Sequence, residues 1–172
     1  MRAHLGGSSR QSLLAARTAL DAAVKGIDAQ AASTLSNELF FIANILGSNI
    51  SVRRALTDPS RDAQAKGVFV KDLLASKVGA AALGLLTEIA ALRWSGAKDL
   101  VHVIEQLAIE AEASAANIAG ELDRVEDELF TAATAFAGST ELRKALTSVA
   151  TNAKATLVAD ILKGASGSTI KL

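Results

Sequence analysis

The stretch ELFFIANILGSNISVRRALTDP, residues Glu38–Pro59, combines an apolar helical segment, a short basic segment and the only proline of the chain. A shift of ninety residues aligns its first twenty positions, without a gap, with ELFTAATAFAGSTELRKALT, residues Glu128–Thr147. Eight of these positions are identical, which is more than chance explains. The identical pairs are Glu38/Glu128, Leu39/Leu129, Phe40/Phe130, Ala43/Ala133, Arg53/Arg143, Ala55/Ala145, Leu56/Leu146 and Thr57/Thr147.

The similarity resumes after a small change in length, where VKDLLAS (Val70–Ser76) matches VADILKG (Val158–Gly164). The sequence therefore predicts a duplicated helical unit. We expect an N-terminal helical bundle over residues 1–119 and an incomplete second helical repeat over residues 120–172. By this alignment residues 165–172 begin the counterpart of the fifth helix of the first unit.

Composition predicts an all-α fold, and periodicity together with the repeat predicts a six-helix bundle followed by a partial second copy. Of the 172 residues, 36 are alanine, one is proline and six are aromatic, so helix formers dominate over strand formers. Basic and acidic residues both number 18, so no net charge steers the chain toward nucleic acid. The absence of cysteine excludes disulfides, thiol nucleophiles and thiolate metal sites.

Apolar periodicity predicts helices separated by glycine, serine and proline breaks. The predicted helices cover residues from Ser8 or Ser9 to 25, 28–46, a short segment ending before Pro59, 61–75, 79–94, 99–119, 121–137, 141–146 and 152–163. We expect Ser8 or Ser9 to cap the first helix and Asp28 to cap the second.

The amphipathic patterns also predict which faces are buried. In the fourth helix, Val68, Phe69, Leu73 and Leu74 are expected inward, whereas Arg61, Lys66, Lys71 and Asp72 are expected outward. The fifth helix is apolar almost all round, which is typical of a helix surrounded by others. The apolar run Val78–Leu92 has fifteen residues and contains Glu88, too short to span a bilayer.

The sequence offers little support for chemistry or metal binding. His102 and Glu105 lie three residues apart on a helix, but a metal site needs further ligands. The acidic residues of the seventh predicted helix, between 121 and 128, spread around its circumference and indicate a solvated helix start. No nucleophile elbow or phosphate-binding glycine loop occurs. Trp94 is expected to pack between helices.

Two interaction hypotheses remain. Arg53, Arg54, Arg61 and Lys66 could meet phosphates in a helix-turn-helix arrangement, although the neutral charge balance disfavours nucleic acid. The first and fifth helices carry more apolar surface than a small bundle easily buries, which predicts a groove for the amphipathic helix of a partner.

Three motifs in this order resemble the delta-subunit family of actinobacterial F-type ATP synthases. They are LTDP (Leu56–Pro59), RWSGAKDL (Arg93–Leu100) and LDRVEDELF (Leu122–Phe130), and the resemblance covers nearly all of the chain. The duplicated helical unit also resembles that family, and its first copy is similar to the six-helix bundle of the mitochondrial oligomycin-sensitivity-conferring protein.

This resemblance implies a noncatalytic stator subunit at the cytoplasmic face of the cell membrane, peripheral to it, that supports proton-driven ATP synthesis. It implies no cofactor, no metal and no nucleic acid. The implied partners are the N-terminal helix of an alpha subunit, held between the first and fifth helices, and the b subunit of the peripheral stalk. The implied alpha-subunit interface consists of Leu13, Leu14, Arg17, Leu20, Leu83, Leu86, Ile89 and Ala90.

In the family a small C-terminal domain meets the b subunit. This sequence ends at Leu172, before such a domain, so we expect a C-terminally truncated form. A free-standing helical adaptor, or a regulator that binds nucleic acid, is the alternative interpretation.

Overall fold

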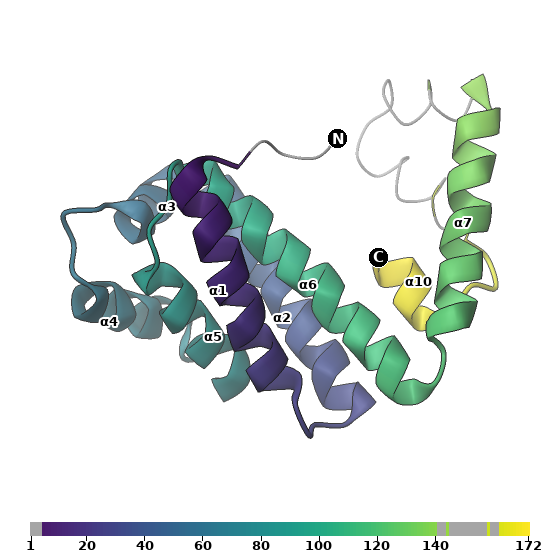
Figure 1. Ribbon diagram of the computed structural model, residues 1–172, viewed down its shortest axis with the longest axis horizontal. Coiled ribbons are helices and arrows are strands. Elements are labelled where there is room, and N and C mark those ends of the chain that lie inside the picture. The colour runs from purple at the N-terminus through teal and green to yellow at the C-terminus, as the bar shows by residue number, and fades with distance from the viewer. Residues whose placement is uncertain (1–4, 141–143, 145–157, 159–161) are drawn as a thin grey trace.

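The computed structural model describes residues 5–140, 144, 158 and 162–172, and all regular secondary structure within them is α-helical, as the composition predicts (Figure 1). The helices predicted over 141–146 and 152–163 lie almost wholly outside the described residues. The described helices are α1 (Gly7–Val24), α2 (Ala29–Ser48), α3 (Ile50–Thr57), α4 (Ala63–Leu74), α5 (Ala80–Ala91), α6 (Ala97–Ala119), α7 (Leu122–Gly138) and α10 (Gly167–Lys171).

Local sequence signals explain most helix boundaries. The Asp28 carboxylate accepts a hydrogen bond from the Ala31 amide at 2.7 Å, so the predicted cap of α2 is confirmed. Gly120 follows α6 with a positive φ of 72°, a conformation that glycine adopts without steric cost. The predicted serine cap of α1 is wrong, because Gly6 takes that position and Ser9 instead accepts a hydrogen bond from the distant Ser95 amide at 2.8 Å.

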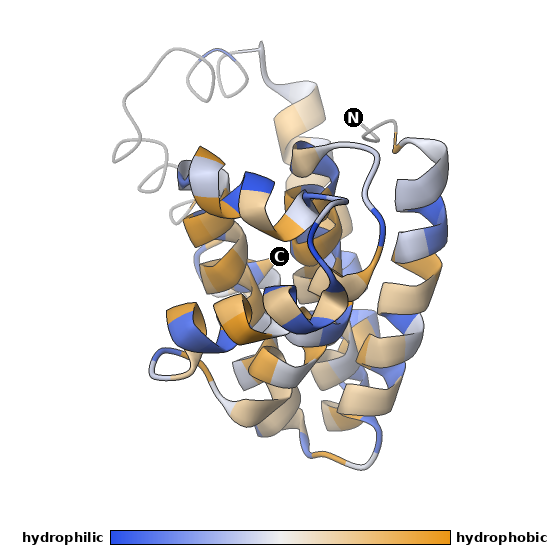
Figure 2. Cartoon of the chain, turned by 90° about the vertical axis from the view of Figure 1, so that its left-hand side faces the viewer, coloured by the Kyte–Doolittle hydropathy of each residue, from blue (hydrophilic) through white to orange (hydrophobic). Residues whose placement is uncertain are grey.

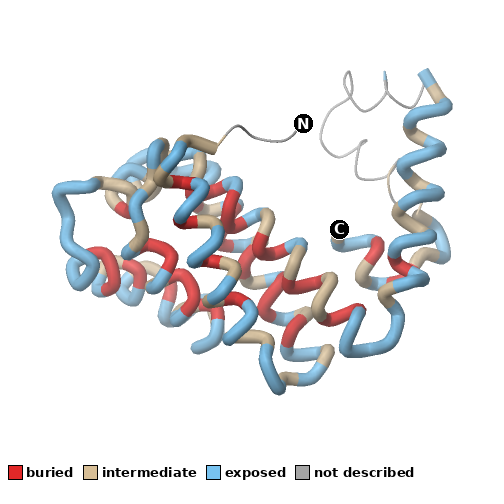
Figure 3. Tube along the Cα trace, viewed as in Figure 1, coloured by how far each residue is buried: buried red, intermediate tan, exposed pale blue. Residues whose placement is uncertain are grey.

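Helices α1–α6, which we call the N-terminal bundle, share one aliphatic core. The contact between α2 and α6 is the most extensive in the described part of the chain, and α1 packs against both α5 and α6. Figure 3 shows the buried positions along the inner sides of these helices. The largest fully buried apolar side chains are Leu35, Leu39, Ile42, Leu46, Leu56, Leu74, Leu86, Ile89, Leu100, Ile104 and Leu107. Removing them from water supplies the main driving force for folding.

The surroundings of α5 differ from those that the sequence predicts. Its inner side is buried, but Ala81, Gly84, Glu88 and Ala91 are exposed along the opposite side. Apart from Glu88, the residues on this exposed side are small and uncharged, and they do not require that neighbours cover them. The expectation of a helix enclosed on all sides is therefore wrong, because apolar alanine and glycine do not by themselves indicate burial.

The inward face of α4 also differs from the prediction. Lys66, expected outward, is 5% exposed, whereas Val68, expected inward, is 54% exposed. The buried stripe runs through Lys66, Val70 and Leu74 at a spacing of four residues. Gly67 lies beside Thr87 of α5, where an added Cβ would come within 3.2 Å of the threonine methyl group. This close approach fixes which side of α4 meets α5.

After Gly120 the chain turns away from the bundle into α7, and α10 lies between α7 and α6 (Figure 1). One contact repeats in both predicted units. Glu38 accepts a hydrogen bond from the Gly79 amide, just before α5, at 2.7 Å. Its counterpart Glu128 accepts one from the Ser166 amide, just before α10, at 2.8 Å. The position of α10 agrees with the predicted start of a second fifth helix.

A second contact joins α10 to the N-terminal bundle. The Glu112 side chain on α6 is 1% exposed and accepts hydrogen bonds from Ser168 at 2.8 Å and from Ser33 at 3.1 Å. Lys171 forms an ion pair with Glu112 at 3.5 Å and also donates a hydrogen bond to Ser33. This buried carboxylate thus gains several donors from α10 and α2, which offsets the cost of its burial.

Candidate partner interface on α1 and α5

Half of the predicted interface residues lie in the core. Leu20 is 2% exposed, and Leu86, Ile89 and Ala90 have no exposed surface. They face the other helices of the N-terminal bundle, so a partner cannot contact them while the bundle stays closed. Their role at a partner interface stays a prediction, since a hydrophobic pattern alone does not distinguish a binding groove from a core.

The other four predicted residues do not converge on one groove. Leu14 is 64% exposed on α1, whereas Leu13 is half-buried and packs against the core. Arg17 points to α6, where its guanidinium donates to Glu110 at 2.5 and 2.9 Å. Leu83 lies on the face of α5 shared by Thr87, the residue that packs against α4. Leu14 is therefore the most accessible apolar side chain among the predicted interface residues.

The charge of Arg17 is satisfied within the chain. Its hydrogen bond to Glu110 raises the pKa of Arg17 above its ordinary value, and the charges of Glu110 and Asp21 act in the same direction. The pair is partly exposed, with 40% of the arginine side chain and 31% of the glutamate side chain accessible. A surface pair of this kind contributes little stability, so a partner could compete for either group.

Exposed small residues line the outer sides of α1 and α5. Ala15 and Ala22 are exposed on α1, and Ala81 and Gly84 are exposed on α5. Helices bearing small residues allow another backbone to approach closely, whereas bulky side chains would hold it away. Leu14 and these small residues are thus the accessible positions of the two helices, whereas Leu20, Leu86, Ile89 and Ala90 lie in the core.

Two of the four basic residues proposed for nucleic-acid contact, Arg53 and Lys66, are held within the bundle. The Arg53 Nη1 atom donates to the Leu46 and Gly47 carbonyl groups at 2.8 and 2.7 Å, which satisfies the end of α2. Lys66 is buried. Arg54 and Arg61 remain exposed, but two side chains do not form the extended basic surface that phosphate backbones require.

No group of three or more histidine, aspartate or glutamate residues placed to hold a metal ion occurs in the described part of the chain. His102 Nδ1 lies 3.3 Å from Glu105 Oε2, and both side chains are about half exposed. Trp94 packs against the core as predicted, and its indole N–H donates to the Ile89 carbonyl at 3.2 Å. These contacts stabilise the bundle and assemble no catalytic group.

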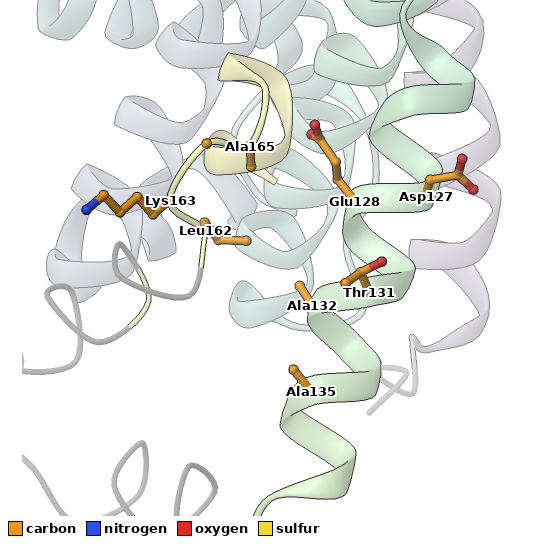
Figure 4. Close-up of a pocket in the computed structure, with 9 residues that line it drawn as sticks. Asp127, Glu128, Thr131, Ala132, Ala135, Leu162, Lys163 and Ala165 are labelled. Atoms are coloured by element: carbon orange, nitrogen blue, oxygen red, sulfur yellow. The ribbon is translucent and has the colours of Figure 1, made fainter.

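A cavity of about 320 Å³ lies between α7 and residues 162–165. Figure 4 shows Ala132 and Ala135 beside it, with Asp127 and Lys163 pointing away from each other. Glu128, at its edge, accepts from the Thr169 hydroxyl at 2.6 Å. That hydrogen bond, with the one from the Ser166 amide, lowers the pKa of Glu128 from its ordinary value of 4.5 to about 2.

The sequence did not predict the tertiary hydrogen bonds of Glu112 and Glu128. The carboxylate of Glu112 lies in an alanine-rich stripe of α6 that predicts only helix packing. A signal existed for Glu128, because its repeat partner Glu38 makes the equivalent contact. No local pattern indicates the burial of Glu112, since its donors come from segments far away in the sequence.

The structure first gives the class of protein, an all-helical chain with a packed core and an accessible helical face. The described residues assemble no catalytic or metal site. Sequence comparison then shows which proteins the chain resembles. No protein-family model matches the chain. It is 42% identical over 158 residues to the ATP synthase subunit delta of Streptomyces coelicolor, an alignment that covers 91% of this chain and 57% of that relative.

Two further relatives with the same name support this result. The chain is 40% identical to ATP synthase subunit delta of Kineococcus radiotolerans, covering 96% of this chain and 61% of the relative. It is 37% identical to that of Salinispora arenicola, covering 91% and 58%. The chain is thus similar to ATP synthase delta subunits over more than nine-tenths of its own length, and it spans about three-fifths of the length of the curated relatives it matches.

None of the described helices combines the length and the hydrophobicity needed to cross a membrane.

Proposed function

We propose that this chain is part of a noncatalytic stator subunit of an F-type ATP synthase. In this role it joins the catalytic head to the peripheral stalk, at the cytoplasmic face of the membrane, and so supports proton-driven ATP synthesis. The observation that carries the proposal is the similarity to ATP synthase delta subunits over more than nine-tenths of the chain. The whole subunit would also contact the b subunit of the stalk.

The proposed contact with the head is the N-terminal helix of an alpha subunit, bound across α1 and α5. Leu14 supplies the exposed apolar anchor, and the small residues of both helices permit close approach. Leu13 and Leu83 border the surface, and Arg17 supplies a cation beside it. Leu20, Leu86, Ile89 and Ala90 support this surface from the core.

A stator needs rigidity and tight binding, since it must resist torque without performing chemistry. The continuous aliphatic core of the N-terminal bundle supports rigidity, because a closely packed interior transmits strain. An interface of standard size buries about 1,600 Å², and a helix of several turns laid on α1 and α5 approaches its lower range. Several such contacts in series would increase the overall affinity.

The direct test is calorimetric titration of the chain with a synthetic peptide that has the sequence of an alpha-subunit N-terminal helix. We expect saturable binding with one site. Leu14→Gln should weaken binding by at least about tenfold, since a buried apolar anchor is lost. Val68→Gln is the matched control, because Val68 is a similarly exposed apolar residue, on α4 instead of α1.

Failure of the peptide to bind the folded chain would contradict the proposed alpha-subunit contact. Equal weakening by Leu14→Gln and Val68→Gln would contradict its location on α1. Circular dichroism of each variant checks that the fold is retained, which is expected because both side chains are exposed.

A further inference from the structure

A second cavity lies at the end of the N-terminal bundle that faces the viewer in Figure 2. Its volume is about 330 Å³, within the range of small-molecule sites. Four elements contribute to its wall: the start of α1, the connection between α3 and α4, α4 itself, and the segment after α5. Its polar and aromatic lining residues are Ser8, Thr57, Arg61, Lys66, Arg93 and Trp94.

The unusual member of this lining is Lys66. It is 5% exposed and occupies the core-facing stripe of α4, yet it lines the cavity. Its ammonium group has no hydrogen bond or ion pair with any described residue. Its ammonium nitrogen is not among the fully enclosed unpaired polar atoms of the described residues, so the aliphatic stem is buried while the charged end reaches the cavity.

The acid whose charge acts on Lys66, Asp58, forms no ion pair with it. Asp58 acts on Lys66 only through its charge, because its carboxylate accepts hydrogen bonds from the Ser60 amide at 2.9 Å and the Ser60 hydroxyl at 2.7 Å. Burial lowers the pKa of Lys66, and the attraction of Asp58 opposes this shift without cancelling it. An anion in the cavity would supply the missing counter-charge.

Two guanidinium groups accompany the lysine. Arg61 and Arg93 are exposed and line the same cavity, and neither forms an ion pair with a described residue. Guanidinium groups bind phosphate oxygens in a bidentate manner, whereas an ammonium group binds them as a point charge. The hydroxyl groups of Ser8 and Thr57 add further polar atoms to the wall.

We propose that this cavity binds a phosphate group, held by Lys66, Arg61 and Arg93. The lining contains three cations and no carboxylate, which matches a dianion better than a monovalent carboxylate ligand. The phosphate is either free or carried by a small phosphomonoester whose organic part lies along Trp94. The site is separate from the Leu14 surface and does not depend on the proposed stator role.

Trp94 makes the test direct. It is the only tryptophan of the chain, which has no tyrosine, so its fluorescence reports on this cavity. The experiment titrates the whole chain separately with inorganic phosphate and with glycerol phosphate at constant ionic strength, and uses glycerol and potassium chloride as blanks. We expect a saturable change with a dissociation constant of about 1 mM or lower, accompanied by a higher melting temperature.

Lys66→Met should weaken this binding at least about tenfold, since this cation of the lining is lost. Lys71→Met is the matched control, because Lys71 is exposed on the same helix and should leave binding unchanged. Arg93→Gln, at an exposed position, provides a second variant that leaves the core intact.

Saturation by both phosphates supports a general phosphate site, and saturation by the ester alone supports a site that also reads the organic part. A response no larger than that of the blanks overturns the proposal. Equal binding by the Lys66→Met and Lys71→Met variants, both shown to be folded, overturns it as well.

Discussion

The two predicted repeat units have related sequences, but their apolar residues are buried to different extents. In the N-terminal bundle, α2 buries six apolar residues, most of them against α6. In α7, which corresponds to α2 in the repeat, the single buried residue is Val125, and Phe130 is 74% exposed. The described contacts of α10 with α6 and α7 are mainly polar, through Glu112 and Glu128.

The repeated segment therefore does not determine its own burial. The glutamate at the equivalent positions 38 and 128 accepts a hydrogen bond from the backbone just before α5 in the first unit and just before α10 in the second. The apolar face requires a closing helix, which α6 supplies for α2. We propose residues 1–119 and 120–172 as the two domains, the first stabilised by aliphatic packing and the second attached by hydrogen bonds.

The strongest test of this comparison uses two equivalent leucines. Leu39 of α2 is completely buried, whereas Leu129 of α7 is half-buried. Leu39→Ala should lower the free energy of unfolding by about 2–5 kcal/mol, because it removes core contacts and leaves a cavity. Leu129→Ala should lower it by less than about 1 kcal/mol. Urea denaturation measures both, and equal losses would contradict the proposed difference between the units.

A smaller effect is expected at the buried carboxylate that joins α10 to the bundle. Glu112→Gln keeps the shape of the side chain but removes its charge, which weakens its hydrogen bonds to Ser168 and Lys171. Amide hydrogens of α10 should exchange about tenfold faster, while those of α2 stay protected. Glu110→Gln, on the same helix and paired with Arg17, is the control and should leave α10 unchanged.

The Glu128 contact predicts a local dependence on pH. Its pKa is about 2 in the folded chain and ordinarily 4.5, so ionised Glu128 stabilises the α7–α10 contact above pH 4.5. This stabilisation should fall as pH drops from 4.5 to 2. The Ser166 amide resonance should shift over this interval, and Glu128→Gln should abolish the shift. An unchanged pH profile in Glu128→Gln would assign the transition to another group.

The smallest effect on stability is expected at Leu14. Because this side chain is 64% exposed, Leu14→Gln should change the free energy of unfolding by less than about 0.5 kcal/mol. Thermal unfolding followed by circular dichroism measures this change. A loss as large as that of Leu39→Ala would show that Leu14 belongs to the core and is not available to a partner.

The sequence predicted the helices better than it predicted their surroundings. Periodicity located each described helix to within a few residues, and the repeat anticipated the position of α10. The sequence predicted Lys66 on the outer side of α4, and Leu86 and Ile89 at a partner interface, whereas the structure buries all three side chains. A helical pattern identifies an apolar face, but the neighbouring helices decide which positions water reaches. The burial of Glu112 likewise could not be predicted from the local sequence, since its hydrogen-bond donors lie 56 and 79 positions away.

Hydrogen exchange measured with and without the alpha-subunit peptide locates the binding surface on the whole chain. Binding across α1 and α5 predicts slower exchange in these helices, around Leu14 and Gly84, with no change in α7 and α10. Protection confined to α7 and α10, or no protection at a saturating peptide concentration, would contradict it.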